Sequence, residues 1–513
     1  MKISNYYTSL SKKIPCDSPD FLISKSNLEN YYDASDILMI EDAIHKEKNK
    51  KFVEIFRDLC GIKGEEDEAF KIFFVVKRKF IICEGITYMF SNHSWVPLNN
   101  PKLTSIYLEN YLQDDLKKYE IELHEFPKLT LTPEILLYLS SERFTELLNK
   151  RNFIRFNNGV YDVDKMAFRD GLPSDFITLS TDIDFIKEPN EELEKSLDDF
   201  LDKIFPDSSV KHYFLCYMAS CLEGKNRNKI FSIWSGIGNN GKSAMISLVE
   251  NSFGSYVCKS PTSLFTGRRT GSSSATPELL SLEDRLISFV QESDTKEAIN
   301  VGTLKELTGN DTIYARGLYS TPKNIVIKSK FILVTNRVYS LTGADNAAWA
   351  RIKVIPFESS FIKESDLEKL REEKSEKLKN SYLMDTRFIE KVKRLAPIFI
   401  KRLVKYYENS RNKIEGYDCE NLPYCEKVEI NTEALKFQNS PVTSFVKNMF
   451  EQKENSYLSL ELVFNEFKTW AKQYYNIKSY KITDFSNDLK RLDITVFEDN
   501  IIGYKINKKV FKI

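Results

Sequence analysis

The sequence predicts an α/β protein of several domains, and three observations support this prediction. The chain has 513 residues, a length that suits about three domains. Hydrophobic residues make up 42% and aromatic residues 13% of the chain, which is enough for large buried cores. Between residues 205 and 362, short apolar runs typical of strands alternate with helical stretches, and one such run leads through a glycine-rich loop into a helix. We therefore expect the central α/β core at 205–362.

Residues 1–200 are expected to form a mixed α+β domain before this core. A helix is predicted at 43–59 and strands at 70–76 and 79–83, and two amphipathic helices at 191–201 and 209–222 lead into the core. Residues 153–164 read FIRFNNGVYDVD, which predicts two strands joined by an Asn-Asn-Gly turn. The acid pairs Asp162/Asp164 and Asp182/Asp184 resemble the carboxylates of a two-metal site, but a solvated hairpin explains them more simply. This domain therefore offers no predicted catalytic site.

The central stretch of the core, residues 231–243, reads FSIWSGIGNNGKS and contains the pattern GxxxxGK[ST]. An apolar run precedes it and a helical run follows, so the pattern lies between a strand and a helix. In that setting backbone N–H groups turn toward phosphates, Lys242 reaches the β and γ oxygens, and Ser243 holds Mg²⁺. The expected nucleotide contacts are Gly236, Gly238, Asn239, Asn240, Gly241, Lys242, Ser243 and Ala244. A glycine-rich turn with a chance lysine is the alternative interpretation.

A phosphate-binding loop of this kind needs an acid on a neighbouring strand to complete the Mg²⁺ shell and orient the attacking water. Residues 285–292, RLISFVQE, form an apolar run that ends in an acid, so Glu292 is the predicted residue. The usual pair of acids is here Gln291-Glu292, and Asp294 is a second candidate. The predicted metal ligands are thus Ser243 and Glu292, with ATP and Mg²⁺ as cofactors.

Two further polar residues stand at the ends of predicted strands. Asn336 follows the run FILVT and is expected beside the glycine-rich loop, where its amide orients the lytic water or senses the γ-phosphate. Arg351 precedes the run IKVIPF, which closes the core. An arginine placed across a subunit interface would be an arginine finger, and such groups raise turnover by roughly 10³ to 10⁵.

These segments together resemble the core of a superfamily 3 helicase of the AAA+ class, and more narrowly the poxvirus-type and phage/plasmid-type primase-helicases. The resemblance rests on GIGNNGKS, RLISFVQE, LKELTGNDTIYARGLY, FILVTN and DNAAWARIKVIPF, in that order. It covers residues 230–360. The FNNGVYDVD stretch is similar to the domain that precedes the helicase in this family, and residues 126–200 match it best.

The resemblance implies a ring, expected as a homo-hexamer, with ATP bound between subunits. Lys242, Ser243, Glu292 and Asn336 would act within one subunit, and Arg351 would come from its neighbour. A hairpin after Asp311 would grip one DNA strand in the channel, with Arg316, Tyr319 and Lys323 as the expected contacts. The family's upstream primase module has an acid and histidine signature that the first 150 residues lack, so we expect no primer synthesis and a separate primase or polymerase.

The carboxyl-terminal part divides into two predicted regions. Residues 363–435 are expected to form a helical lid or linker, with a charged run at 364–379 and an apolar helix at 386–407 that Pro397 should kink. Residues 440–513 resemble a winged-helix domain. Its helices are expected from Ser440, at 460–475 and from a capping Thr483, followed by a two-stranded wing at 495–497 and 501–506. The predicted DNA contacts are Asn487, Lys490 and Arg491. A small interaction or dimerisation domain is the alternative.

The composition of the chain bears on how it could bind DNA, metal ions or a membrane. Lys and Arg equal Asp and Glu at 74 each, so DNA must bind to local patches. The eight cysteines and four histidines form no C-x-x-C zinc half-site, and no apolar stretch is long enough to span a membrane. We expect a cytoplasmic replicative DNA helicase of a bacterial mobile element or a large DNA virus, acting on single- and double-stranded DNA. It could also recognise its own origin. The alternatives are an AAA+ ATPase that remodels or packages without unwinding, and a binding protein whose nucleotide site serves assembly.

Overall fold

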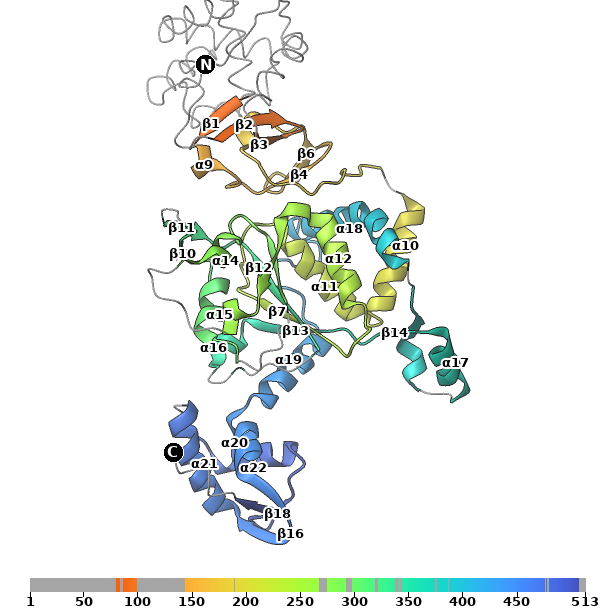
Figure 1. Cartoon of the computed structure of the whole chain (residues 1–513). Helices are drawn as coiled ribbons and strands as arrows, with labels where there is room; N and C mark the ends of the chain where they lie inside the picture. Colours follow the sequence, from red (N-terminus) through yellow and green to blue (C-terminus); the bar gives the residue numbers. More distant parts are fainter. Residues whose placement is uncertain are drawn as a thin grey trace, which may run out of the picture. The chain divides into compact units, whose positions relative to one another are not determined.

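The computed structural model describes residues 80–83, 86–98, 144–188, 190–266, 275–291, 298–318, 322–336, 341, 344–373, 376–385, 387–475, 477 and 479–506. The chain divides into two compact units. The first comprises Met1–Lys187 with Phe253–Ser255, and the second comprises Glu188–Ser252 with Tyr256–Ile513. Figure 1 labels the elements of both units.

The first unit contains two small antiparallel sheets. Their strands are β1 (Phe80–Cys83), β2 (Ile86–Ser91) and β3 (Ser94–Leu98), then β4 (Phe153–Phe156), β5 (Gly159–Asp162) and β6 (Ala167–Arg169), with the short helix α9 (Phe144–Leu147) between the two sheets in sequence. The predicted hairpin is confirmed, because β4 and β5 pair across Asn157-Asn158. The predicted helix at 43–59 and strand at 70–76 lie outside the described residues.

The two acids of that hairpin differ in environment. Asp162 is 4% exposed, and its Oδ1 accepts a hydrogen bond from Lys165 N at 3.0 Å. Asp164 is exposed and accepts a hydrogen bond from Asn152. The prediction of a solvated pair is therefore wrong for Asp162, whose carboxylate closes the turn after β5. Asp182 and Asp184 are both exposed.

The core of the second unit is a five-stranded sheet in which every neighbouring pair is parallel. In spatial order the strands are β13 (Ile352–Pro356), β7 (Phe231–Ser235), β12 (Lys330–Thr335), β9 (Ile287–Gln291) and β8 (Val257–Pro261). The strands β7 and β12 lie inside the sheet and are almost entirely buried, as is typical of parallel strands covered on both faces. This confirms the predicted α/β class.

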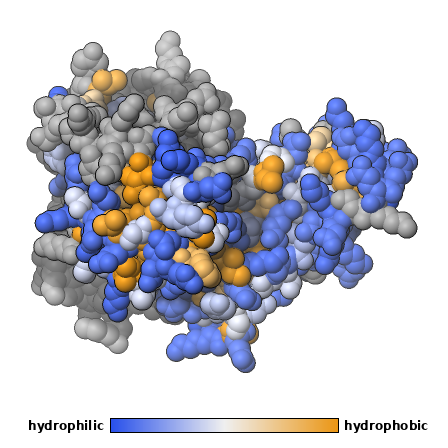
Figure 2. Space-filling view, turned by 90° about the horizontal axis from the view of Figure 1, so that it is seen from below, coloured by the Kyte–Doolittle hydropathy of each residue, from blue (hydrophilic) through white to orange (hydrophobic). Residues whose placement is uncertain are grey.

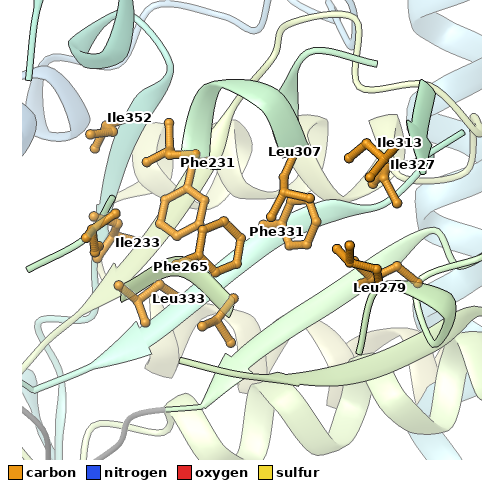
Figure 3. Packing of buried hydrophobic residues seen from close by; sticks show 14 of the residues in the cluster. Phe231, Ile233, Phe265, Leu279, Leu307, Ile313, Ile327, Phe331, Leu333 and Ile352 are labelled. Carbon is orange, nitrogen blue, oxygen red and sulfur yellow. The ribbon is translucent and has the colours of Figure 1, made fainter. Parts of the chain in front are cut away.

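Alternating residues of β7 pack against the two faces of the sheet. On one face Phe231 meets Phe265 at a ring distance of 5.0 Å, and Phe265 meets Phe331 at 5.1 Å (Figure 3). On the other face Trp234 lies 5.5 Å from Phe214. The helices of this core are α10 (Glu191–Ile204), α11 (Ser208–Ser220), α12 (Lys242–Phe253), α13 (Ser263–Thr266), α14 (Pro277–Leu280), α15 (Val301–Thr308) and α16 (Asn346–Trp349).

The predicted hairpin after Asp311 is present as β10 (Thr312–Ala315) and β11 (Lys323–Val326), which pair in antiparallel fashion. After the core come β14 (Ser360–Ile362), α17 (Glu364–Glu372), β15 (Ser381–Leu383), α18 (Phe388–Arg411) and α19 (Glu426–Gln438). The predicted apolar helix is present as α18, with Pro397 inside it. Helix α19 packs along β13, the edge strand of the sheet.

The last described segment has its own hydrophobic core around Phe445, Phe467 and Phe485. Its elements are α20 (Pro441–Met449), β16 (Phe450–Ser459), α21 (Leu460–Tyr475), α22 (Ile482–Arg491), β17 (Val496–Phe497) and β18 (Asn500–Ile506). Ser440 caps α20 as predicted, by accepting a hydrogen bond from Thr443 N at 3.1 Å. Strand β16 was not predicted. The prediction for Thr483 is wrong, because α22 begins at Ile482 and Lys481 is in the cap position.

Candidate nucleotide-binding site

The glycine-rich loop joins β7 to α12 at the carboxyl end of the sheet, and the parallel register places Asn336 beside it. Thr335, the last residue of β12, pairs with Ser235, the last residue of β7. The next residues, Asn336 and Gly236, therefore leave neighbouring strands at the same level. The N-terminus of α12 faces this edge, and such an end attracts anions because its N–H groups are unpaired and the helix dipole is positive there.

Lys242 is held in place by three oxygen atoms. Its Nζ donates to Gly236 O at 2.8 Å, to Asn240 Oδ1 at 2.9 Å and to Asn336 Oδ1 at 2.7 Å. The lysine is only 6% exposed, so its position is fixed by these bonds and by packing. These bonds occupy all three N–H donors of the ammonium group, so a phosphate would be bound by exchange of one or more of them while the side chain stays at the sheet edge.

Two of the loop glycines are required by close approach. A Cβ on Gly236 would lie 1.9 Å from Asn240 Nδ2. Gly241 has a φ of +82°, and a Cβ there would lie 2.1 Å from Ile204 Cδ1. The loop is also tied to the chain after the sheet, since Phe361 N donates to Asn239 O at 2.7 Å. These contacts fix the loop against α10 and β14.

A cavity of about 1010 Å³ opens in front of the loop. One wall consists of residues 238–244 and the end of β12, including Asn336; the other walls come from α10, β14, β15 and α18. Part of the lining is apolar, with Phe200 and Phe388 stacked at 4.7 Å. Ser243 is exposed and lines the cavity. A cleft of this size with an apolar part and a few polar groups suits a nucleotide.

Sequence reasoning missed the basic groups that α18 and α10 contribute to the cavity. Arg394 and Lys195 are exposed, line the cavity, and form no ion pair within the described residues. Lys391 also lines it but pairs with Asp385. The signal on α18 was present in the sequence, since Lys391 and Arg394 lie three residues apart and therefore on the same side of a helix.

Arg351 lies at the amino ends of the sheet strands, whereas the glycine-rich loop lies at their carboxyl ends. Its neighbour Ile352 pairs with Phe231, the first residue of β7, while the loop follows the last residue of β7. At about 3.3 Å per residue, the two positions are roughly 15–20 Å apart along the strand. The guanidinium donates to Thr308 Oγ1 at 3.0 Å and to the Lys305 carbonyl. Arg351 therefore does not contact the nucleotide site of its own chain.

The hairpin residues lie in different environments. The backbone of Arg316 exchanges hydrogen bonds with Thr276, and Lys323 forms an ion pair with Glu283. Tyr319 lies outside the described residues, as do Glu292 and Asp294. The outward face instead presents Tyr314, which is 54% exposed and which sequence reasoning did not select.

A buried cation, Lys330, lies at the start of β12, away from the cavity. It is 2% exposed, and its Nζ donates to Ser220 O at 2.5 Å and to Lys225 O at 3.0 Å. Burial lowers the pKa of Lys330, and neighbouring Cys221 and Glu223 oppose that effect. The lysine satisfies carbonyl groups at and after the end of α11, which is a structural role.

Residues 76–206 match the family model described as "D5 N terminal like". This range includes the 126–200 segment in which the sequence predicted similarity to a domain preceding the helicase. No helix in the described residues is long and apolar enough to cross a membrane. Among the same residues, no group of three or more His, Cys, Asp or Glu side chains could hold a metal ion.

The chain is similar to several viral proteins. It is 32% identical over 349 residues to "Putative helicase 184R" of Invertebrate iridescent virus 6, covering 65% of this chain and 35% of that protein. It is 29% identical over 452 residues to "Putative helicase L207/L206" of Acanthamoeba polyphaga mimivirus, covering 80% and 46%. It is 20% identical over 414 residues to "Putative primase C962R" of African swine fever virus, covering 78% and 42%. The chain thus spans between a third and a half of the length of these relatives.

Among solved structures, the C-terminal region of NrS-1 matches 85% of this chain and 99% of its own length. The sequence identity is 13% and the TM-score is 0.42.

Proposed function

We propose that this chain is an ATP-dependent DNA helicase that acts in replication, working as a homo-hexamer with nucleotide bound between subunits. The observation that carries the proposal is the arrangement at the sheet edge, where Lys242 is held by Asn336 and the loop carbonyl of Gly236 in front of a nucleotide-sized cavity. The similarity to viral proteins named helicases supports the same reading.

The residues present fit ATP with Mg²⁺. Lys242 faces the β and γ oxygens, the N–H groups at the start of α12 bind phosphate, and the exposed Ser243 offers its hydroxyl to the metal. Magnesium, when bound, neutralises part of the phosphate charge. Asn336 positions the lytic water or the γ-phosphate, and Glu292 is the proposed base and second metal ligand. Arg394 of α18 adds a positive charge on the far wall of the cavity.

Arg351 is proposed to act on the site of the neighbouring subunit. Arg351 lies at the amino ends of the strands, too far away to contact a nucleotide bound at the carboxyl ends of the same sheet. In a ring, the side of a subunit that carries Arg351 can face the next subunit. To reach that site, the guanidinium exchanges its bonds to Thr308 and Lys305 for the phosphate of the neighbour. In the channel, the β10–β11 hairpin is proposed to grip one DNA strand. The last segment, with Asn487, Lys490 and Arg491 exposed on α22, is proposed to be a winged-helix domain.

Mixing two inactive variants tests the shared site. Lys242→Ala and Arg351→Ala should each abolish ATP hydrolysis, because each removes one half of every site. In an equal mixture, about a quarter of the interfaces combine an intact Lys242 with an intact Arg351, so hydrolysis should return in part. No recovery would show that Arg351 does not act in trans. Thr308→Val removes the hydroxyl that Arg351 contacts at rest and that also donates to Leu304 O at 2.7 Å. This variant should keep hydrolysis and thus controls for a purely structural effect.

Unwinding is tested separately. The triple change Arg316→Ala, Tyr319→Ala and Lys323→Ala should keep basal ATP hydrolysis but lose unwinding of a forked duplex, since the hairpin handles the strand and not the nucleotide. Undiminished unwinding by this variant would refute the role of the hairpin in gripping DNA, whereas ATP hydrolysis without any unwinding by the wild-type chain would favour an ATPase that remodels its target without separating strands.

A further inference from the structure

The C-terminal segment carries a second cavity, of about 370 Å³, lined by residues of α21 and by Ile477, Ser479 and Tyr480, which precede α22. We call it the α21 groove. Its polar lining consists of Asn465, Lys468, Thr469, Lys472, Ser479 and Tyr480. No acidic side chain is among the described residues that line it. The face seen in Figure 2 is largely hydrophilic, with hydrophobic residues gathered in smaller groups.

Four of these residues form one stripe of α21. Asn465, Lys468, Thr469 and Lys472 occur at i, i+3, i+4 and i+7, a spacing that places them on one side of a helix. The core side of the same helix is formed by other residues, such as Phe467. Both lysines are exposed, and within the described chain neither forms an ion pair. The groove therefore presents two positive charges one helical turn apart, of which Lys468 also lies over the Phe464 ring at 5.0 Å.

Helix α22 and the β17–β18 hairpin have a different balance of charged residues from the α21 groove. Residues 481–506, which comprise these elements, contain four basic and five acidic residues, whereas residues 465–480 contain three basic residues and one acidic residue. Asp488 accepts a hydrogen bond from Tyr480 Oη at 2.6 Å and lies 3.5 Å from Arg491 Nη1. The charge of Arg491, one of the predicted DNA contacts, is thus partly compensated by its own helix.

We propose that the α21 groove binds the phosphodiester backbone of duplex DNA and is the main electrostatic contact of this segment. The inference rests on the proposed function, which makes DNA the substrate. Lysine, serine, threonine, asparagine and tyrosine side chains are the groups that commonly contact phosphate and sugar, and together they line this groove. Single strands are usually held by exposed aromatic rings, but the one ring in the groove, Tyr480, is half-buried and bonded to Asp488.

Backbone contacts carry no sequence information, so this contact is independent of sequence. Any origin recognition would have to come from other residues. The groove would instead keep the segment on duplex DNA, with an affinity that depends steeply on salt.

The experiment compares the full-length wild-type chain with Lys468→Ala/Lys472→Ala. A matched control, Lys447→Ala/Lys453→Ala, removes two exposed lysines of the same segment outside the groove. Fluorescence anisotropy measures the affinity for a labelled random-sequence duplex at several salt concentrations. Losing two phosphate contacts should make the slope of log K against log salt shallower by about 1.8 and weaken binding at least tenfold at ~0.1 M salt. The control should match the wild type.

Several results would overturn the proposal. These are no duplex binding by the wild-type chain, an unchanged slope in the groove variant, or an equal change in the control. A larger loss for Lys490→Ala/Arg491→Ala than for the groove variant would place the contact on α22. ATP hydrolysis, measured in parallel, separates the two hypotheses. Normal ATP hydrolysis together with lost duplex affinity in the Lys468→Ala/Lys472→Ala variant supports DNA binding by the α21 groove. Absent ATP hydrolysis in the wild-type chain refutes the proposed helicase function but not DNA binding by the groove.

Discussion

The position of Asn336 leads to a prediction in which two substitutions at one residue have different effects. Asn336→Asp keeps the shape of the side chain but adds a negative charge 2.7 Å from Lys242 Nζ, near the γ-phosphate that this lysine would bind. Two unit charges about 6 Å apart, at an effective dielectric constant of ~20, repel by about 3 kcal/mol. This corresponds to a rise of roughly 100-fold in the Kd for ATP.

Asn336→Ala removes the amide without adding charge. We expect the Kd for ATP to change by less than about fivefold, because Lys242 keeps its other two partners. The kcat for hydrolysis should fall by about 10²-fold, the usual loss for one positioned hydrogen-bond group in an active site. Calorimetry with a non-hydrolysable ATP analogue gives Kd, phosphate release gives kcat, and thermal unfolding controls for folding. Equal losses of affinity in both variants, or a normal kcat in Asn336→Ala, would refute the reasoning.

Three further predictions concern stability. Gly241→Ala should lower the Tm in a thermal melting experiment by several degrees, because the new Cβ would lie 2.1 Å from a side chain of α10. The control Gly238→Ala should leave the Tm unchanged, because its new Cβ meets no atom within 4 Å. Asp207→Ala removes the N-cap of α11 and should cost about 1 kcal/mol in urea denaturation at neutral pH. Hydrogen bonds, chiefly from the Ser209 hydroxyl, lower the pKa of Asp207 from 3.8 to about 2, so its contribution is complete above pH 3.8 and is lost as the pH falls toward 2. Thr432→Val leaves the buried Val354 N–H without its acceptor and should cost about 1–3 kcal/mol, while Thr432→Ser should keep most of the stability.

The features that local sequence determines could be predicted. The glycine-rich loop lies between β7 and α12 because the apolar run, the glycines and the helical run are adjacent in the chain. The position of Asn336 followed from a strand that ends in a polar residue, since carboxyl ends of parallel strands share an edge. Likewise the start of α20 is encoded by Ser440-Pro441, where a serine caps the helix and proline fits its first turn.

Features that depend on distant parts of the chain could not be predicted. The cavity brings α10 and α18 together, although Phe200 and Phe388 are far apart in sequence, and no local pattern indicates that their rings stack. The ion pair between Lys323 and Glu283 is equally non-local. Asp162 follows a turn and reads as solvated, yet packing buries it. Strand β16 was missed because its residues are largely polar and lack clear alternation.

For the proposed homo-hexamer, the sheet limits where a second copy of the chain could approach. At one side of the sheet another chain cannot pair with the edge strand β13, because α19 covers it and Thr432 of α19 accepts the hydrogen bond of Val354 N at 3.0 Å; β8 is the edge strand on the other side. Exposed apolar side chains lie instead near the nucleotide site, where Ile237 of the loop is 90% exposed and Leu383 of β15 is 52% exposed. Burying these side chains would favour association at the mouth of the cavity. In the proposed shared site, Arg351 of a neighbouring subunit would enter at this mouth of the cavity, since Arg351 of the same chain lies at the other end of β7.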